Sequence, residues 1–138
     1  MKIPVNQGIR QGDSLSPLLF NIIMNEIIKD LRDLQGYPLR DENVNIVCYA
    51  DDATLIADNE VDLQRLLTRF SQSCTKFDLK ISSKETKSLI ISKEPLHCKL
   101  QVYNTPIEQV TSFNYLGVQI TGSKDLTTEV KHQDIKAS

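Results

Sequence analysis

Long hydrophobic runs are absent from this chain of 138 residues. Spanning a membrane takes about eighteen or more consecutive apolar residues, so we expect no segment of that kind. The first residues, MKIPVNQGIRQGD, turn polar before any apolar core begins, which excludes an ordinary secretory signal. The length suits one domain, or part of one, with a core of modest size.

Cysteine and histidine are also scarce. The three cysteines, Cys48, Cys74 and Cys98, lie far apart, no CxxC motif occurs, and there are two histidines. An odd and scattered set argues against both a disulfide framework and a zinc site, and it suits a reducing compartment. We therefore expect each cysteine to be a small buried apolar residue.

An excess of positive charge is missing too. The net charge is −2 and the isoelectric point about 5.7, which weighs mildly against a nucleic-acid-binding domain. The charge is uneven, however, because five lysines between residues 76 and 93 accompany only Asp78 and Glu85. A solvated face explains such a cluster as well as contacts with phosphate groups do, and the sequence leaves both open.

Two helices are expected. The first runs over 17–34: Ser16 is a natural N-cap, Pro17 fits the first helical position and Gly36 marks a stop. The second is capped by Asn59, with Asp62 in the capping-box position. Helical spacing places these apolar residues on one face of each helix: Leu19, Phe20, Ile23, Met24, Ile27, Leu31 and Leu34 in the first; Leu63, Leu66, Leu67, Phe70, Cys74 and Phe77 in the second.

The remaining apolar segments are short and rich in β-branched residues. VNIVCYA and ATLIA are separated by two aspartates, and they predict a tight hairpin with Asp51 and Asp52 at its turn. KSLIIS, KLQVY and FNYLGVQIT predict three further strands. The order of helix, hairpin, helix and strands favours an α+β fold, with an antiparallel sheet and helices packed on one of its faces.

The paired aspartates admit two interpretations. Short carboxylates tolerate turn geometry, so Asp51 and Asp52 fit an ordinary hairpin turn. Yet the flanks are apolar and the turn lacks the Gly or Asn that two-residue loops favour. Adjacent carboxylates repel in a partly dry site unless a cation intervenes, and Mg²⁺ binds one or two carboxylates together with substrate phosphates. An EF-hand is excluded, because DDATLIADNEVD lacks the alternating oxygen ligands and the central Gly.

The context of the pair resembles a known family. YADD resembles the YxDD box of reverse transcriptases, on the hairpin of the palm domain. GIRQGDSLSPLLFNIIMNEI resembles the element before the palm helix, FDLKISSKETKSLII the segment LKIN…KTK, and FNYLGVQIT the primer-grip strand. The four elements keep the family order from Gly8 to Thr121. They resemble the enzymes of non-LTR (LINE-type) retrotransposons, with group II intron and other bacterial enzymes as relatives.

The resemblance implies a nucleotidyl-transfer site. Asp51 and Asp52 would be the catalytic metal ligands, with Asp51 the main one, for Mg²⁺ or alternatively Mn²⁺. In such sites two ions about 4 Å apart activate the primer 3′-hydroxyl and steady the leaving pyrophosphate. Tyr49 and Ala50 would lie beside the primer terminus.

The same resemblance assigns further contacts. Gln11 and Gly12 would approach the templating base pair and the incoming nucleotide, and Tyr115, Leu116 and Gly117 would form the primer grip. Simpler explanations stay open, because Gly12 also suits a turn before a helix, while Tyr115 and Gly117 also suit a strand aromatic and a bulge.

Two residues depart from the family pattern. Ser82 stands where the family commonly has Asn, and Glu85 stands at a Lys position. That Lys is often assigned to protonating the pyrophosphate. Lys84 and Lys87 are candidate replacements as general acid, although a solvated lysine describes either equally well.

The predicted organisation is a truncated enzyme. Residues 1–122 would form the C-terminal part of the palm and 123–138 the start of the thumb, while the first catalytic aspartate would lie N-terminal to Gly8, outside this chain. The resemblance implies template-directed addition of deoxynucleotides to a DNA primer on an RNA template, in the nucleus or a cytoplasmic ribonucleoprotein, without activity in this chain alone. The alternative is a non-catalytic retroelement remnant that binds nucleic acid or a protein.

Overall fold

The computed structural model describes residues 3–11, 17–49, 52–92, 96–115 and 118–121; for 3–11, 49, 113–115 and 118 it describes the backbone. Within these ranges the chain forms two helices and twelve strands: β1 (Ile3–Gln11), α1 (Pro17–Leu31), β2 (Tyr37–Leu39), β3 (Glu42–Val44), β4 (Ile46–Tyr49), β5 (Asp52–Ala57), α2 (Glu60–Lys76), β6 (Leu79–Ile81), β7 (Lys87–Leu89), β8 (Gln101–Val102), β9 (Thr105–Pro106), β10 (Glu108–Val110), β11 (Ser112–Tyr115) and β12 (Val118–Thr121).

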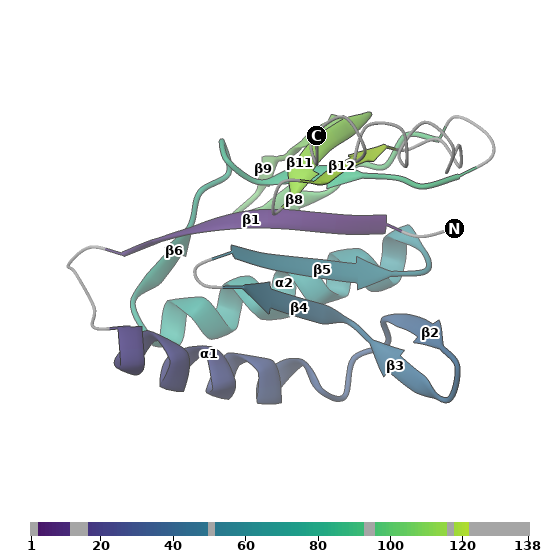
Figure 1. Cartoon of the computed structure of the whole chain (residues 1–138). Coiled ribbons are helices and arrows are strands. Elements are labelled where there is room, and N and C mark those ends of the chain that lie inside the picture. Colours follow the sequence, from purple (N-terminus) through teal and green to yellow (C-terminus); the bar gives the residue numbers. More distant parts are fainter. Residues whose placement is uncertain (1–2, 12–16, 50–51, 93–95, 116–117, 122–138) are drawn as a thin grey trace, which may run out of the picture.

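A six-stranded sheet organises the molecule around β1 (Figure 1). Its order is β10-β7-β1-β5-β4, and β6 pairs with the far end of β1. All neighbours are antiparallel except β7 and β10, which run parallel. Sequence patterns did not predict β1, because Asn6, Gln7 and Gly8 interrupt its apolar content. Its partners on both sides, rather than its own composition, fix it as the central strand.

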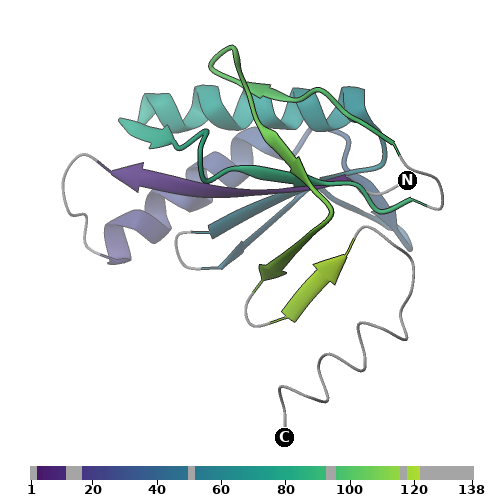
Figure 2. The same cartoon turned by 90° about the horizontal axis from the view of Figure 1, so that it is seen from above.

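Both helices lie on the same side of this sheet, and the β11–β12 pair lies on the other side (Figure 2). The core forms between the helices and the sheet, where Ala53, Leu55 and Ala57 of β5 are wholly buried. The predicted combination of helices with an antiparallel sheet is therefore present. No helix in the described ranges has the length and apolar character needed to cross a membrane.

Helix α2 agrees with its prediction both in its N-cap and in its buried apolar face. The Asn59 side chain accepts a hydrogen bond of 2.8 Å from the backbone N–H of Asp62, as an N-cap does. The expected apolar stripe is buried at Leu63, Leu66, Leu67, Phe70 and Cys74, with Phe77 partly buried against the same core.

Helix α1 begins at Pro17 as predicted but ends at Leu31, before the expected position 34. Its buried line is Phe20, Met24, Ile27 and Leu31. The broad predicted face is wrong at Leu19, which is 44% exposed, because α1 packs mainly against α2 and so needs a narrower apolar stripe. The predicted N-cap, Ser16, lies outside the described residues.

The end of α1 is fixed by Asn45, which lies between β3 and β4. The Asn45 side chain donates hydrogen bonds to the carbonyls of Leu31 (2.7 Å) and Leu34 (3.1 Å). A Cβ atom on Gly36 would lie 2.4 Å from the carbonyl oxygen of Val44. Gly36 is therefore required by close backbone approach, beyond the helix end, rather than as the direct helix stop that the sequence suggested.

The later strands differ in part from their prediction. KSLIIS contains β7 and KLQVY contains β8, as expected. FNYLGVQIT is not one strand, because it contributes to both β11 and β12. These two strands pair antiparallel with each other, with Ser112 opposite Thr121 at one end and Tyr115 opposite Val118 at the other. The predicted stub at 123–138 lies outside the described part of the chain.

Candidate active site on the open face of the sheet

Asp52 begins β5 and is flanked by a strand on each side. It pairs with Tyr49 of β4 and with Gly8 of β1. β4 and β5 pair antiparallel, and their ladder includes the pair Tyr49–Asp52, so Asp52 belongs to the strand rather than to the turn predicted for it. Asp51 and Ala50 lie outside the described residues.

Strand alternation sets the direction of the Asp52 side chain. Ala53, Leu55 and Ala57 point into the core beneath the helices, so Asp52 and every second residue after it belong to the opposite face. Asp52 is half-buried there. The carboxylate therefore lies on the face of the sheet that neither helix covers.

Thr54 is the next residue on that open face. It is 7% exposed, and its Oγ1 atom has no hydrogen-bond partner within the described residues. Buried polar atoms are normally paired, so this hydroxyl, two positions from Asp52, is an exception within the described residues, although its oxygen is covered by protein. Sequence reasoning missed Thr54, although the alternation of ATLIA carried that signal.

The cysteines close to this site take no part in its chemistry. Cys48 lies on the core-facing side of β4, and burial raises the pKa of its thiol to about 11. Burial, with a smaller contribution from Cys48, raises the pKa of Cys74 to about 12. Cys98 is buried as well, and all three are free, as predicted. At neutral pH the thiols are protonated, which disfavours metal binding and nucleophilic attack.

A larger metal cluster is not seen in the part of the chain that the structure describes. No group of three or more His, Cys, Asp or Glu side chains converges within those residues. Asp52 is the one predicted metal ligand that they include. The described site therefore offers one carboxylate, that of Asp52, as an oxygen donor.

The other predicted site residues are spread over the sheet. Gln11 ends β1 and pairs with Leu79 of β6, while Gly12 lies outside the described residues. Tyr115 ends β11 and pairs with Val118. Leu116 and Gly117 are also outside the description, so the geometry of the predicted primer grip is left untested.

The two candidate general acids have different surroundings. Lys87 forms a 2.6 Å ion pair with Glu108 and donates a 2.9 Å hydrogen bond to the carbonyl of Lys84. It lies in register with Asn6 of β1, which in turn faces Thr54, so Lys87 is on the same sheet face as Asp52. Two strand spacings, about 10 Å, separate β7 from β5. Lys84 is exposed, in the turn between β6 and β7.

That turn also explains one departure from the family pattern. The Ser82 hydroxyl accepts a hydrogen bond from the backbone N–H of Glu85 (3.3 Å), and its carbonyl accepts from the Thr86 hydroxyl (2.6 Å). A short polar side chain at the start of a turn makes such local bonds whether it is Ser or Asn. Ser82 therefore satisfies the turn in the way that Asn would.

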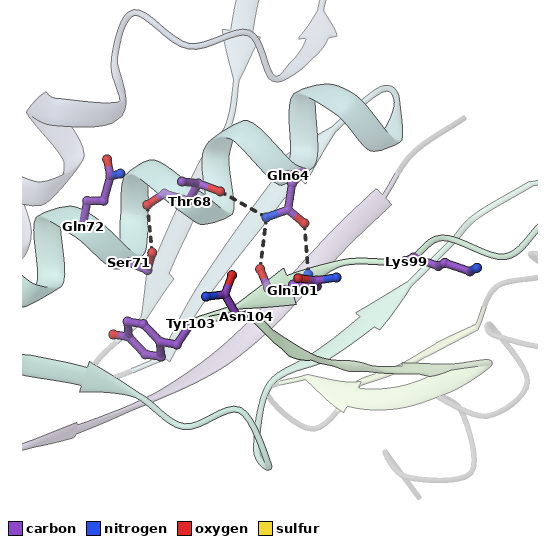
Figure 3. A pocket seen from close by; sticks show the side chains of 8 residues that line it. All are labelled: Gln64, Thr68, Ser71, Gln72, Lys99, Gln101, Tyr103 and Asn104. Carbon is purple, nitrogen blue, oxygen red and sulfur yellow. Dashed lines mark hydrogen bonds between the residues drawn. The ribbon is translucent and has the colours of Figure 1, made fainter.

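A groove lies on the helix side of the sheet, between α2 and the β8–β9 hairpin (Figure 3). It has a volume of about 510 Å³. Gln64 closes one end: its amide donates to the carbonyl of Gln101 and accepts from the N–H of Gln101, both at 3.0 Å. Tyr103 and Asn104 form the opposite wall. Sequence reasoning missed this groove, because its walls lie far apart in the chain.

Comparisons with known proteins agree with the four sequence elements. The sequence model of the family described as "Reverse transcriptase (RNA-dependent DNA polymerase)" matches residues 1–120. The chain is 31% identical over 124 residues to the "Retrovirus-related Pol polyprotein from type-1 retrotransposable element R2" of Nasonia vitripennis, an alignment that covers 81% of this chain and 12% of that protein.

Two further relatives carry the same name. The protein of Popillia japonica is 28% identical over 127 residues, covering 84% of this chain and 18% of the relative. That of Bradysia coprophila is 26% identical over 138 residues, covering 92% and 16%. The chain thus spans less than a fifth of the length of these relatives. The match over residues 1–120 shows that the chain belongs to the reverse transcriptase family, of the non-LTR retrotransposon type that its motifs predicted.

Proposed function

We propose that this chain is a palm segment of an RNA-directed DNA polymerase, which adds deoxynucleotides to a DNA primer on an RNA template. The observation that supports this most is the position of Asp52, half-buried at the head of a central strand, on the open face of the sheet. In this proposal residues 1–122 belong to the palm and residues 123–138 begin the thumb.

The oxygen donors at this site fit a divalent cation. Asp52 supplies a carboxylate, and Asp51 precedes it in the sequence. Mg²⁺ is typically held by one or two carboxylates and by substrate phosphates, so this donor set suits Mg²⁺, and Mn²⁺ as its substitute. When bound, the metal supplies positive charge that stabilises the phosphates and the attacking oxygen.

The protein groups have distinct tasks in this proposal. Asp51 and Asp52 hold the metal, with Asp51 as the main ligand. Tyr49 and Ala50 lie beside the primer terminus, and Gln11 with Gly12 approaches the template and the incoming nucleotide. The segment of Tyr115, Leu116 and Gly117 holds the primer.

The proton for the leaving pyrophosphate has two candidate donors in this chain. Lys87 shares the sheet face of Asp52, but Glu108 neutralises it and must release it before it can act. Lys84 is exposed and needs no such release. We therefore propose Lys84 as the better candidate of the two.

Two carboxylates do not hold two cations at the spacing that nucleotidyl transfer requires. We propose that this chain alone does not polymerise, and that its activity needs further segments of a longer protein. The competing function is a non-catalytic module that binds nucleic acid or a protein and has lost its cation site.

Paramagnetic Mn²⁺ tests the cation site directly. In NMR spectra of the chain, low concentrations of Mn²⁺ are expected to broaden the backbone signals of Asp52, Ala53 and Thr54, and excess Mg²⁺ is expected to restore them. The variant Asp52→Asn should weaken this broadening, while Asp58→Asn, at the far end of the same strand, should leave it unchanged. Broadening that is absent, or equal in Asp52→Asn, would favour the non-catalytic module.

A further inference from the structure

The polar groove between α2 and the β8–β9 hairpin lies on the helix side of the sheet (Figure 3). Strand alternation places Asp52 on the opposite face. The groove is therefore separate from the proposed metal site. We propose that this groove binds single-stranded nucleic acid, with an unstacked base against Tyr103 and the phosphates along the cations that flank it.

The backbone at Tyr103 carries the first part of the argument. Val102 pairs with Thr105, so Tyr103 and Asn104 form a two-residue hairpin loop, and both have positive φ angles, of 52° and 60°. Such loops favour Asn and Gly at both positions, because other side chains are strained there. A tyrosine in this conformation costs stability, and strain of this kind is commonly kept at ligand sites.

The tyrosine ring is also held in place and left accessible. Tyr103 Oη accepts a hydrogen bond of 3.3 Å from the backbone N–H of Ile81. The side chain is nevertheless 42% exposed, and it forms one wall of the groove opposite Ser71 of α2 (Figure 3). A fixed, half-exposed aromatic ring is the kind of platform on which single-stranded bases stack.

Amide groups lie around this ring. In Figure 3, the amides of Gln72 and Asn104 take no part in the hydrogen bonds drawn between the lining residues, whereas Gln64 is engaged with Gln101. Asn and Gln amides offer a donor and an acceptor side by side, which matches the edges of nucleobases. A base stacked on Tyr103 would therefore meet hydrogen-bonding groups.

Charge along this surface favours a polyanion. Two further hollows adjoin the groove, and the three together are lined by four cations, Arg65, Arg69, Lys80 and Lys99, and by one carboxylate, Asp78. The whole chain, by contrast, has a net charge of −2. The positive strip along α2 is therefore a local feature, of the kind that contacts phosphates.

The other carboxylates near the strip are already engaged. Asp30, close to Arg69, accepts hydrogen bonds from Ser73 (2.7 Å) and Lys76 (3.4 Å). The Asp62 carboxylate accepts a 2.8 Å hydrogen bond from the Asn59 amide and lies 3.7 Å from Arg65. Glu60 accepts a 2.8 Å hydrogen bond from the backbone N–H of Lys99. They offset part of the positive charge, but Lys80 and Lys99 are exposed at the two ends of the strip. Duplexes keep their bases stacked, so the exposed ring selects a single strand.

The test is binding of a fluorescent RNA oligonucleotide of about 12 nucleotides, and of DNA of the same sequence, in chelator and low salt. We expect measurable, salt-sensitive binding to the unaltered chain. Tyr103→Asn should weaken it roughly tenfold without lowering the melting temperature, because Asn fits the loop better. Tyr103→Phe keeps the ring and should keep most of the affinity. A difference between the RNA and DNA arms tells which strand the groove prefers.

Charge variants locate the phosphates. Lys80→Gln and Lys99→Gln should each lower the dependence of log affinity on log salt by about 0.7, the value for one phosphate contact with a single strand. Arg32→Gln, an exposed cation on the α1 side, is the matched control and should change neither quantity. The proposal is overturned if folded Tyr103→Asn binds like the unaltered chain, or if Arg32→Gln weakens binding as much as Lys99→Gln does.

A measurement on the unaltered chain covers the case in which variants unfold. Side-chain amide NMR signals of Gln72 and Asn104 should shift on addition of RNA, and unshifted signals would overturn the proposal. The oligonucleotide binding is measured in chelator, so it requires no bound cation. A negative Mn²⁺ experiment would therefore not affect the oligonucleotide-binding result. Likewise, absence of oligonucleotide binding would not affect the Mn²⁺ result.

Discussion

The side chain of Asn45 reaches back to the carbonyl of Leu31 at 2.7 Å and so ties the first strand of the β4–β5 pair to the end of α1. Asn45 is 9% exposed, and it also bonds the carbonyl of Leu34 at 3.1 Å. Carbonyls at a helix end have no partner within the helix, and the Asn45 amide bonds one of them, that of Leu31, together with the N–H of Leu34. The carbonyl of Leu34, in the turn after the helix, also accepts from the Asn43 amide.

Replacing Asn45 with Ala should therefore destabilise the chain by about 1–3 kcal/mol, since it removes two hydrogen bonds made by a buried side chain. Urea unfolding followed by circular dichroism measures the change. Asn25→Ala, at an exposed position of α1, is the matched control and should stay within about 0.5 kcal/mol. Equal effects of the two variants would mean that the Asn45 amide does not fix the helix end.

Gly36→Ala should be costly for a steric reason. The added Cβ would lie 2.4 Å from the Val44 carbonyl oxygen and 2.5 Å from the Asn45 Cβ. Neither of these atoms can move aside unless the backbone moves with it. We expect a loss of about 1–3 kcal/mol, as in overpacked sites, measured by urea unfolding. The exposed neighbour Gln35→Ala should cost little, and a neutral Gly36→Ala would show that the β2–β3 hairpin shifts freely.

Asp30 should make folding sensitive to acid. Chiefly a 2.7 Å hydrogen bond from Ser73, helped by Lys76 and Arg69, lowers the pKa of Asp30 below its ordinary value of 3.8. A lowered pKa in the folded state means that the ionised group stabilises the fold above about pH 4, and that this stabilisation is lost as the pH falls further.

Ser73→Ala should accordingly reduce stability near pH 7 more than at about pH 2, where the carboxylate is protonated. Urea midpoints at the two pH values measure the difference. Asp33→Asn, on the surface after α1, serves as a control for general charge effects. A Ser73→Ala loss that is independent of pH would indicate lost packing rather than a lost bond to Asp30.

Cys74 should have the opposite pH dependence. Its pKa is raised from an ordinary value of 9.0 to about 12, so folding favours the neutral thiol. The contribution of this raised pKa to the free energy of unfolding is fully present below about pH 9, and it is lost as the pH rises toward 12. We expect Cys74→Ala to lose less stability between pH 7 and about pH 10 than the unaltered chain does.

Alkylation gives an independent measurement of the same burial. Iodoacetamide should modify Cys74 in the native chain far more slowly than in urea, because the reactive thiolate is suppressed. Mass spectrometry after digestion follows each cysteine separately. Rapid labelling of native Cys74 would contradict its complete burial.

Local signals account for the parts of the fold that sequence predicted well. Asn59, Asp62 and the leucine stripe define α2 by contacts within one helix. The end of α1 was misplaced because Asn45, from another element, sets it. Strand β1 was missed because its stability comes from β5, β6 and β7.

The candidate site divides in the same way. The YADD motif predicted Asp52 at the turn of a hairpin, whereas the structure makes it the first residue of β5. That Gly8 lies beside Asp52, and that Thr54 is buried without a described partner, depends on the pairing of distant strands. The strained loop at Tyr103 was invisible because its sequence, Tyr-Asn, lacks the usual Gly.

The central place of β1 also shapes how the chain folds over time. This strand is synthesised early, yet Ile3 pairs with Ala57 and Val5 pairs with Ser88, which are made much later. The entropy cost of closing such long loops arises before the paired strands gain any stability, so sheets of this kind form slowly. During synthesis on the ribosome, β1 must wait without its neighbours until β7 emerges, and the nascent sheet is open to aggregation for that interval.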